Sequence, residues 1–167
     1  NVFQILHLDH VSTSKIISDH RINHVLFTGS VSGGREIKKA IGTRFIGAGL
    51  ELGGKDPAYV RSDCNFEHAV ENLVDGSYFN SGQSCCGIER IYVDESIFDN
   101  FVEAFKIQTE KYNLDNPLGE STNLGPVVKL SAAKNIRNQV LKAINEGAKN
   151  IIDGSNFKKD NSDNCYV

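Results

Sequence analysis

The sequence predicts an α/β fold, in which short strands alternate with amphipathic helices. Compact runs of β-branched and aromatic residues, such as 24–27 and 88–93, predict strands. Other stretches carry apolar residues at helical spacing, most clearly 95–112, where Ile97, Phe98 and Phe101 begin an apolar stripe. With 167 residues the chain is long enough for one domain of ordinary size with a real core.

The composition favours a small-molecule partner. The net charge is −3, with acidic and basic residues interspersed, so nothing marks a surface for nucleic acid or an anionic membrane. No apolar run approaches the roughly 18 residues needed to cross a bilayer, and residues 1–8 lack the pattern of a signal peptide. The spacing of Cys64, Cys85, Cys86 and Cys165 matches neither a metal site nor a disulfide framework. We therefore expect a reducing, cytoplasmic location and no bound metal.

The first elements are expected to be a strand, a helix and a second strand. Residues 2–7 favour a short strand, and 12–17 favour a helix whose hydroxyl residues can cap its start. A turn is expected at 19–21, and a strand at 24–27.

A small-residue turn at 28–34 follows the second strand and precedes a helix at 35–41. Such a turn points backbone N–H groups and the positive end of a helix dipole at whatever lies before the helix, which suits an anionic phosphate. The run Phe27-Thr28-Gly29-Ser30 is neither a Walker loop nor G-x-G-x-x-G. Taken alone, the run favours an ordinary connection between strand and helix over a phosphate site.

The glycine-rich segment 42–54 holds a single acid, Glu51, between Leu50 and Leu52. Such an acid is expected to be partly desolvated, which raises the pKa of a carboxyl group and prepares it to act as a base. The alternative is a glutamate paired with Lys55 or Arg44 in a mobile loop.

The second part of the chain continues the α/β pattern. The expected elements are a strand at 57–60, a helix from Asp63 or Asn65 to Tyr78, a strand at 88–93, a helix at 95–112, a loop at 113–126, a helix at 130–146 that Gly147 closes, a short strand at 150–152, an exposed stretch at 154–164 and the start of a strand at 165.

A polar turn with two adjacent cysteines, Cys85 and Cys86, joins the helix that ends near Tyr78 to the strand at 88–93. Cysteine is the strongest protein nucleophile near neutral pH, and a turn flanked by glycine presents the thiol to a cleft. Taken alone, both residues are also consistent with inert, half-buried thiols. A disulfide between neighbours would close a strained ring and is not expected.

Three motifs occur together in a fixed order. They are Phe27-Thr28-Gly29-Ser30 with Gly34, Leu50-Glu51-Leu52-Gly53-Gly54-Lys55, and Asn80 through Cys86 with Gly82-Gln83-Ser84-Cys85 inside it. In this order and spacing the chain resembles the NAD(P)-dependent aldehyde dehydrogenase superfamily. Leu124-Gly125-Pro126 and Asn145-Glu146-Gly147-Ala148 also resemble segments of that family, so the resemblance extends over nearly the whole chain.

The resemblance implies a role for each motif. It implies that Cys85 is the nucleophile and that Glu51 is the base that activates water. It implies that NAD or NADP is bound by Thr28, Gly29, Ser30, Gly34, Leu52 and Gly53. It also implies that Ser84 and Cys86 line the aldehyde pocket. The implied reaction is oxidation of an aldehyde to a carboxylic acid through a Cys85 thioester, with no metal and no histidine required.

The resemblance also implies a domain division and a partial chain. Residues 1–52 correspond to the C-terminal part of a Rossmann-type cofactor-binding domain, and 53–167 to the first part of the α/β catalytic domain. The family's amide donor to the oxyanion and its glutamate for the nicotinamide ribose have no counterpart in this sequence. We therefore expect the segment alone to be inactive, and the full-length protein to be a homo-oligomer, either a dimer or a tetramer.

Three alternatives remain at this stage. A cysteine-dependent hydrolase or acyltransferase would use Cys85 with one of the histidines and no nicotinamide cofactor. An enzyme that transfers the acyl group to CoA is disfavoured by the presence of Glu51. A non-catalytic homologue is disfavoured because both Glu51 and Cys85 are intact.

Overall fold

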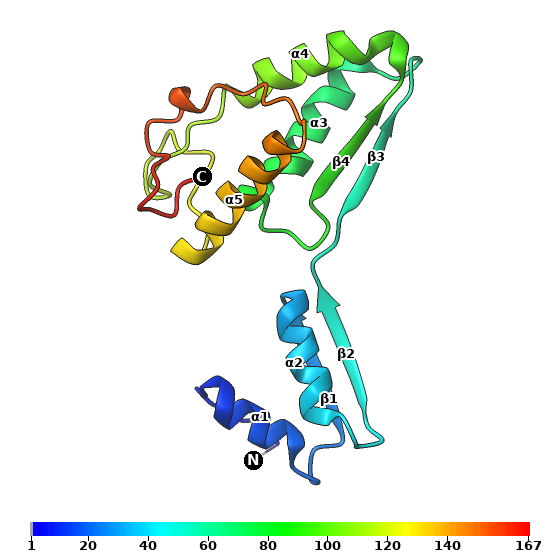
Figure 1. Ribbon diagram of the computed structural model, residues 1–167, viewed down its shortest axis with the longest axis vertical. Coiled ribbons are helices and arrows are strands. Elements are labelled where there is room, and N and C mark those ends of the chain that lie inside the picture. Colours follow the sequence, from blue (N-terminus) through cyan, green and yellow to red (C-terminus); the bar gives the residue numbers. More distant parts are fainter. Residues whose placement is uncertain (1) are drawn as a thin grey trace. The chain divides into compact units, whose positions relative to one another are not determined.

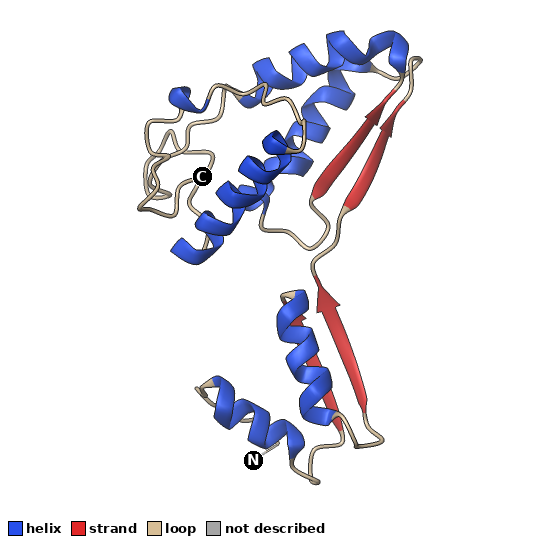
Figure 2. Ribbon diagram, in the orientation of Figure 1, coloured by secondary structure: helices blue, strands red, loops and turns tan. Residues whose placement is uncertain are grey.

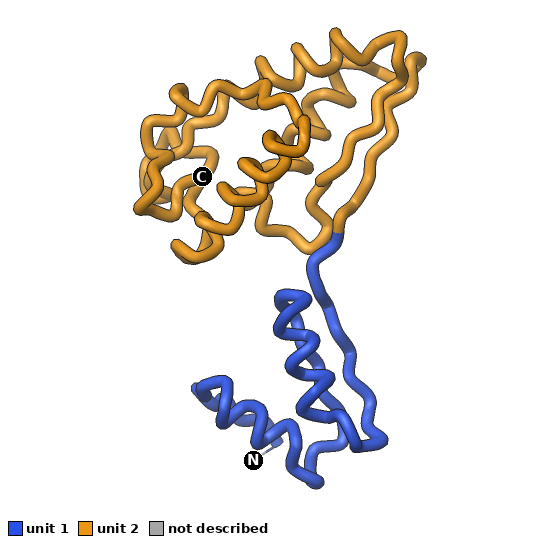
Figure 3. The backbone as a smooth tube through the Cα atoms, viewed as in Figure 1, with its two compact units in different colours: residues 1–54 blue, residues 55–167 orange. Residues whose placement is uncertain are grey.

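The computed structural model describes residues 2–167, and the chain divides into two compact units. Unit 1 spans residues 1–54 and unit 2 spans residues 55–167, as the two colours of Figure 3 show. The division falls two residues after the boundary at 52 that the resemblance implies. Assigning unit 1 to cofactor binding and unit 2 to catalysis remains a proposal.

Unit 1 is a two-stranded parallel sheet with two helices (Figure 1). Its elements are α1 (His10–Ser18), β1 (His24–Gly29), α2 (Val31–Ile41) and β2 (Gly47–Leu52). Helix α2 connects the two strands, as parallel pairing requires, and the register runs from His24 opposite Gly47 to Gly29 opposite Leu52. A small core forms around Ile17, Ile37 and Ile41.

Two expectations for unit 1 were wrong. The segment 2–7 is exposed and forms no strand; its β-branched and aromatic residues have no partner strand among the described residues. Conversely, the glycine-rich segment contains strand β2, which the sequence pattern did not predict. Glycine disfavours strands, but pairing along all of β1 supplies the hydrogen bonds that stabilise this one.

Both helices of unit 1 begin earlier than the sequence pattern suggests, because side chains cap them. The Asp9 carboxylate accepts a hydrogen bond from the backbone N–H of Ser12 at 2.7 Å, so the cap of α1 is Asp9 and not a hydroxyl residue. The Ser30 hydroxyl caps α2, which therefore starts at Val31 and not at Arg35.

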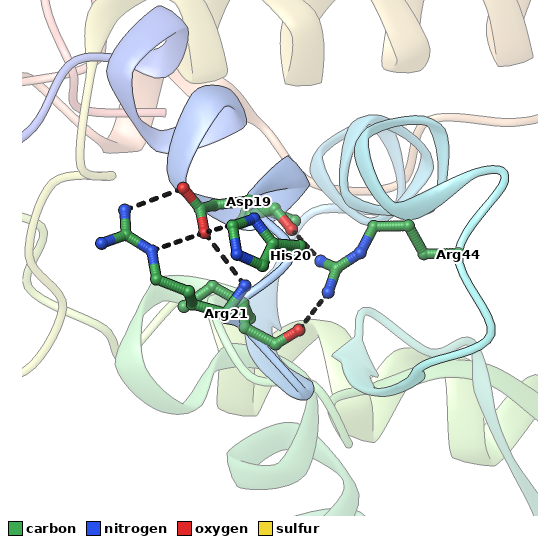
Figure 4. Close-up of polar contacts among 6 residues, drawn as sticks. Asp19, His20, Arg21 and Arg44 are labelled. Atoms are coloured by element: carbon green, nitrogen blue, oxygen red, sulfur yellow. Dashed lines mark hydrogen bonds and ion pairs between the residues drawn. The ribbon is translucent and has the colours of Figure 1, made fainter.

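Arg44 and Asp19 fix the connection between α1 and β1 (Figure 4). The Arg44 guanidinium donates to the carbonyl of Ile17 at 2.9 Å and also to that of Ile22. The Asp19 carboxylate receives two hydrogen bonds from the Arg21 guanidinium, at 2.8 and 2.9 Å, and these hold the pKa of Asp19 well below its usual range. Arg44 is thus committed to backbone carbonyls and does not pair with Glu51.

Unit 2 packs helices against a second two-stranded parallel sheet (Figure 2). Its elements are β3 (Asp56–Val60), α3 (Phe66–Tyr78), η1 (Phe79–Gly82), β4 (Ile88–Val93), η2 (Glu95–Ile97), α4 (Phe98–Thr109), α5 (Leu130–Asn145) and η3 (Gly154–Asn156). Strands β3 and β4 pair in parallel, with a register shift between Asp56 and Pro57. The predicted cap Asn65 is confirmed, since its side chain accepts from the N–H of His68 at 3.3 Å.

The core of unit 2 joins β3, α3 and α4 through Val60, Val70, Val74 and Phe101. The Phe101 ring is 3% exposed and meets the Phe66 ring edge to face, with 6.3 Å between ring centroids. Of the apolar stripe expected at 95–112, Ile97 and Phe101 therefore face the core, whereas Phe98 is exposed.

Replacing Phe101 by alanine should lower the free energy of unfolding of unit 2 by about 3–5 kcal/mol, because a buried ring is lost and a cavity remains. Urea unfolding of the purified chain, followed by circular dichroism, measures this loss. Phe98→Ala on the same helix is the matched control, since Phe98 is 49% exposed. Equal losses for the two variants would contradict the assigned core.

The end of the chain differs from expectation. Residues 150–152 and 165–167 form no strand. The helix expected at 95–112 is a 3₁₀ turn, capped by Asp94, followed by α4. Ile97, at φ −120° and ψ 4°, departs from helical geometry between the two. Helix α5 buries Ala133, whereas its Val140, Leu141 and Ile144 side chains are exposed.

Neither a membrane-spanning helix nor a metal-binding cluster occurs among the described residues. Across residues 2–167, none of the helices has both the length and the apolar character needed to cross a bilayer. In the same range, we find no group of three or more His, Cys, Asp or Glu side chains placed to hold a metal ion.

Candidate active site

The turn that carries the two cysteines has an unusual backbone. After α3 ends at Tyr78, three consecutive residues adopt positive φ: Asn80 at 51°, Ser81 at 58° and Gly82 at 71°. Glycine adopts such angles freely and asparagine tolerates them, but they are uncommon for serine. The left-handed stretch reverses the chain, and Ser84 to Gly87 then form a second turn closed by a 3.3 Å hydrogen bond from the Gly87 N–H to the Ser84 carbonyl.

Both thiols are accessible within unit 2. Cys85 and Cys86 are free and exposed, so they are not the half-buried thiols that their residue type alone suggests. The Sγ atom of Cys86 lies 3.3 Å from the hydroxyl oxygen of Ser84, within hydrogen-bond distance for sulfur. The two residues expected to line a pocket thus contact each other on either side of Cys85.

The strand after the turn is anchored at its first residues. Gly87 is buried, and Lys55 forms an ion pair with Glu89, which sits at the register shift between β3 and β4. Lys55 is therefore committed to Glu89 and not to Glu51. Together with the contacts of Arg44, this removes both partners considered for Glu51.

Glu51 lies in β2, opposite Thr28 of β1, and its side chain is exposed. Side chains of a strand point alternately to the two faces, so Leu50 and Leu52 turn toward the helices while Glu51 turns to the opposite face. The expected desolvation by the flanking leucines is therefore wrong within unit 1. The carboxylate is instead freely presented at the end of the strand.

The predicted cofactor residues meet at the carboxyl ends of β1 and β2. Gly29 pairs with Leu52, and Ser30 follows as the cap of α2, with its hydroxyl accepting from the Gly33 N–H at 3.1 Å. A Cβ at Gly34 would approach the Leu52 side chain to 2.9 Å, so glycine allows α2 to pack tightly on the strand end. Parallel α/β sheets commonly bind ligands at this edge, beside a helix N-terminus.

The structure thus gathers the predicted residues into two groups. Unit 1 brings together Thr28, Gly29, Ser30, Gly34, Glu51 and Leu52, with Gly53 directly after the strand, and unit 2 brings together Ser84, Cys85 and Cys86. Each group is described within its own unit.

Two residues of the cysteine turn gain contacts that the sequence did not suggest. The Ser81 hydroxyl donates to the Gly125 carbonyl at 2.7 Å, and the Gln83 side chain accepts from the Val128 N–H at 2.8 Å. The partners lie 44 and 45 residues away in the sequence. No local periodicity or spacing signals such contacts.

The arrangement is that of an α/β chain with an exposed nucleophile candidate, Cys85, in unit 2 and an exposed acid, Glu51, near the carboxyl end of β2 in unit 1. The whole chain, residues 1–167, matches the model of the aldehyde dehydrogenase family. This protein therefore belongs to the aldehyde dehydrogenase family, and the resemblance inferred from its motifs is confirmed.

Curated relatives of this chain are aldehyde dehydrogenases as well. A lactaldehyde dehydrogenase of Methanocaldococcus jannaschii is 38% identical over 144 residues, which cover 86% of this chain and 31% of the relative. A 3-sulfolactaldehyde dehydrogenase of Priestia megaterium is 35% identical over 134 residues, which cover 80% of this chain and 28% of the relative. The chain thus spans about a third of the length of the relatives that it matches.

Solved structures confirm the fold. The glyceraldehyde-3-phosphate dehydrogenase GapN of M. jannaschii, complexed with NADP, matches with a TM-score of 0.82 and 36% identity over 92% of this chain and 32% of that one. A betaine aldehyde dehydrogenase of Staphylococcus aureus in complex with NAD+ matches with a TM-score of 0.80 and 32% identity over 90% of this chain and 30% of that one. The fold is therefore an α/β portion of the aldehyde dehydrogenase fold.

Proposed function

We propose that the full-length protein oxidises an aldehyde to a carboxylic acid with NAD or NADP, and that Cys85 and Glu51 are its nucleophile and its base. The observation that carries this proposal is the family match over residues 1–167, combined with an exposed thiol at the predicted nucleophile position. Solved relatives complexed with NADP and with NAD+ support the choice of cofactor.

The residues of unit 1 fit a dinucleotide. The first N–H groups of a helix lack partners within the helix; α2 starts at Val31, directly after the end of β1, and the Ser30 hydroxyl bonds one of these groups, the Gly33 N–H. Ser30 presents a hydroxyl there, and Thr28 and Gly29 precede it at the end of β1. We propose that this edge binds a phosphate of the cofactor, while the backbone at Leu52 and Gly53 meets its nicotinamide end.

Cys85 starts the proposed reaction by adding its thiolate to the aldehyde carbonyl carbon, which gives a hemithioacetal. The oxyanion formed in this step needs hydrogen-bond donors, and the backbone N–H of Cys85 is one candidate. Bound nicotinamide supplies a hydride acceptor, so that the adduct on Cys85 is oxidised to a thioester.

Glu51 then acts as general base in the proposed mechanism. Its carboxylate takes a proton from water, the resulting hydroxide attacks the thioester carbonyl, and the C–S bond breaks to release the acid and the Cys85 thiolate. The exposure of Glu51 at the end of β2 supports this role because the carboxylate is not consumed by an ion pair with Arg44 or Lys55.

The test is turnover by the full-length protein. We expect formation of reduced nicotinamide, followed by its ultraviolet absorbance, with at least one aldehyde from a panel that represents the substrates named for relatives: lactaldehyde, 3-sulfolactaldehyde and succinate semialdehyde. Ester hydrolysis without nicotinamide, and no aldehyde oxidation, would instead favour a cysteine hydrolase.

We further propose that the full-length protein is a cytoplasmic homo-oligomer, either a dimer or a tetramer, with no nucleic-acid partner. Four free cysteines in the sequence support a reducing compartment. Light scattering coupled to gel filtration measures the assembly, and a monomer at micromolar concentration would contradict the proposal.

A further inference from the structure

The strained turn before Cys85 is held by side chains in addition to a backbone hydrogen bond from the Gln83 N–H to the Asn80 carbonyl at 3.1 Å. The left-handed angles of Asn80 and Ser81 occur at consecutive residues, and such angles persist only where the surroundings enforce them. The Gln83 amide nitrogen donates to the Asn80 carbonyl at 3.1 Å, and the Asn80 amide nitrogen donates back to the Gln83 carbonyl at 3.1 Å. These reciprocal bonds close the turn at both ends.

The same turn is tied to a distant segment at two points. The Ser81 hydroxyl binds the Gly125 carbonyl, and the Gln83 amide oxygen binds the Val128 N–H. Gln83 therefore uses its amide nitrogen within the turn and its amide oxygen across to the segment 125–128. A single side chain couples the geometry of the turn to that segment, two residues before Cys85.

The segment 125–128 is itself firmly placed in unit 2. Leu124 and Val127 are buried, at 8% and 4% exposed, and the Val127 N–H donates to the Cys165 carbonyl at 2.9 Å. Helix α5 follows at Leu130 and buries Ala133 completely. An anchor with buried apolar residues on both sides can resist the tendency of the left-handed turn to relax.

We infer that Gln83 and Ser81 are positioning residues for Cys85, acting through the anchor segment 125–128. This inference rests on the proposed function, because it takes Cys85 as the nucleophile. Gln83 and Ser81 touch neither thiol among the described contacts; they fix the backbone from which the Cys85 side chain and its N–H project. A displacement of about 1 Å at a reacting group can cost on the order of 10²-fold in rate.

Three variants of the full-length protein separate positioning from stability. Gln83→Met removes both side-chain bonds at similar volume. Ser81→Gly removes the hydroxyl and relieves the positive φ, so it does not add backbone strain. Gln108→Met is the matched control, because Gln108 is a glutamine of the same unit whose side chain accepts from Lys111 at 2.7 Å, away from the turn.

The first measurement is the kinetics of aldehyde oxidation. We expect Gln83→Met to lower kcat about 10- to 100-fold, with KM changed less than threefold. Ser81→Gly should lower kcat about 3- to 10-fold. Gln108→Met should leave both kcat and KM within twofold of the wild type. In the double variant, the fold reduction in kcat should be smaller than the product of the reductions in Gln83→Met and Ser81→Gly, because both side chains bond to the same segment, 125–128.

The second measurement does not need turnover. Iodoacetamide labels the two thiols, and mass spectrometry gives the ratio of Cys85 to Cys86 alkylation under native conditions. We expect this ratio to change at least threefold in Gln83→Met and to stay unchanged in Gln108→Met. If the ratio and kcat of Gln83→Met both equal those of the wild type, the inference is overturned. If the ratio changes while the wild type oxidises no aldehyde, the positioning role stands and the proposed function fails.

Discussion

Replacing Cys85 by alanine in the full-length protein should lower kcat for aldehyde oxidation on the order of 10⁴-fold or more. The proposed thioester forms on this thiol, and alanine offers no substitute nucleophile. Binding of reduced nicotinamide, measured by its fluorescence, should change less than twofold, because the variant leaves all of the proposed cofactor residues of unit 1 unchanged. The variant therefore separates loss of chemistry from loss of cofactor binding.

The neighbouring thiol is the matched control for this result. Cys86→Ala keeps the same backbone turn and removes the contact between Sγ of Cys86 and the Ser84 hydroxyl. If Cys86 only lines the aldehyde pocket, KM should change more than kcat, and kcat should stay within about tenfold of the wild type. A large loss in Cys86→Ala with an active Cys85→Ala would reverse the assignment of the nucleophile.

The sequence predicted most elements because their apolar periodicity is local. The helices α3, α4 and α5 and the strands β1, β3 and β4 each show a clear pattern in the chain. The strand β2 did not, because three of the residues Gly47 to Leu52 are glycine or alanine and its stability comes from pairing with β1. The strand predicted at 2–7 failed for the opposite reason: its local pattern is typical of a strand, but it has no partner strand among the described residues.

For the candidate site, too, the sequence revealed local motifs but not the contacts between distant segments. Order and spacing of the motifs pointed to Cys85 and Glu51, and the structure shows both side chains exposed. The sequence argument for a desolvated Glu51 failed because it counted neighbours along the chain, whereas a strand sends neighbours to opposite faces. The contacts of Ser81 and Gln83 with Gly125 and Val128 required the folded chain, since they join segments more than 40 residues apart.

Replacing Glu51 by glutamine should stop the proposed reaction after the thioester has formed. The amide matches the carboxylate in shape but cannot take a proton from water, and general-base catalysis typically contributes 10²–10⁴-fold. We expect steady-state turnover to fall by about that factor, while a burst of about one reduced nicotinamide per site remains in stopped-flow absorbance. Intact-mass spectrometry should then find the acyl group on Cys85.

The outcome of this experiment tells hydrolysis apart from the earlier steps. Glu36→Gln is the control, because Glu36 belongs to the same unit and pairs with Lys39 at 2.6 Å on the exposed side of α2. It should retain full turnover. A Glu51→Gln variant without burst or acyl-enzyme would place Glu51 before thioester formation, for example in deprotonating the thiol. Undiminished turnover would remove Glu51 from the mechanism, and water would then need another base.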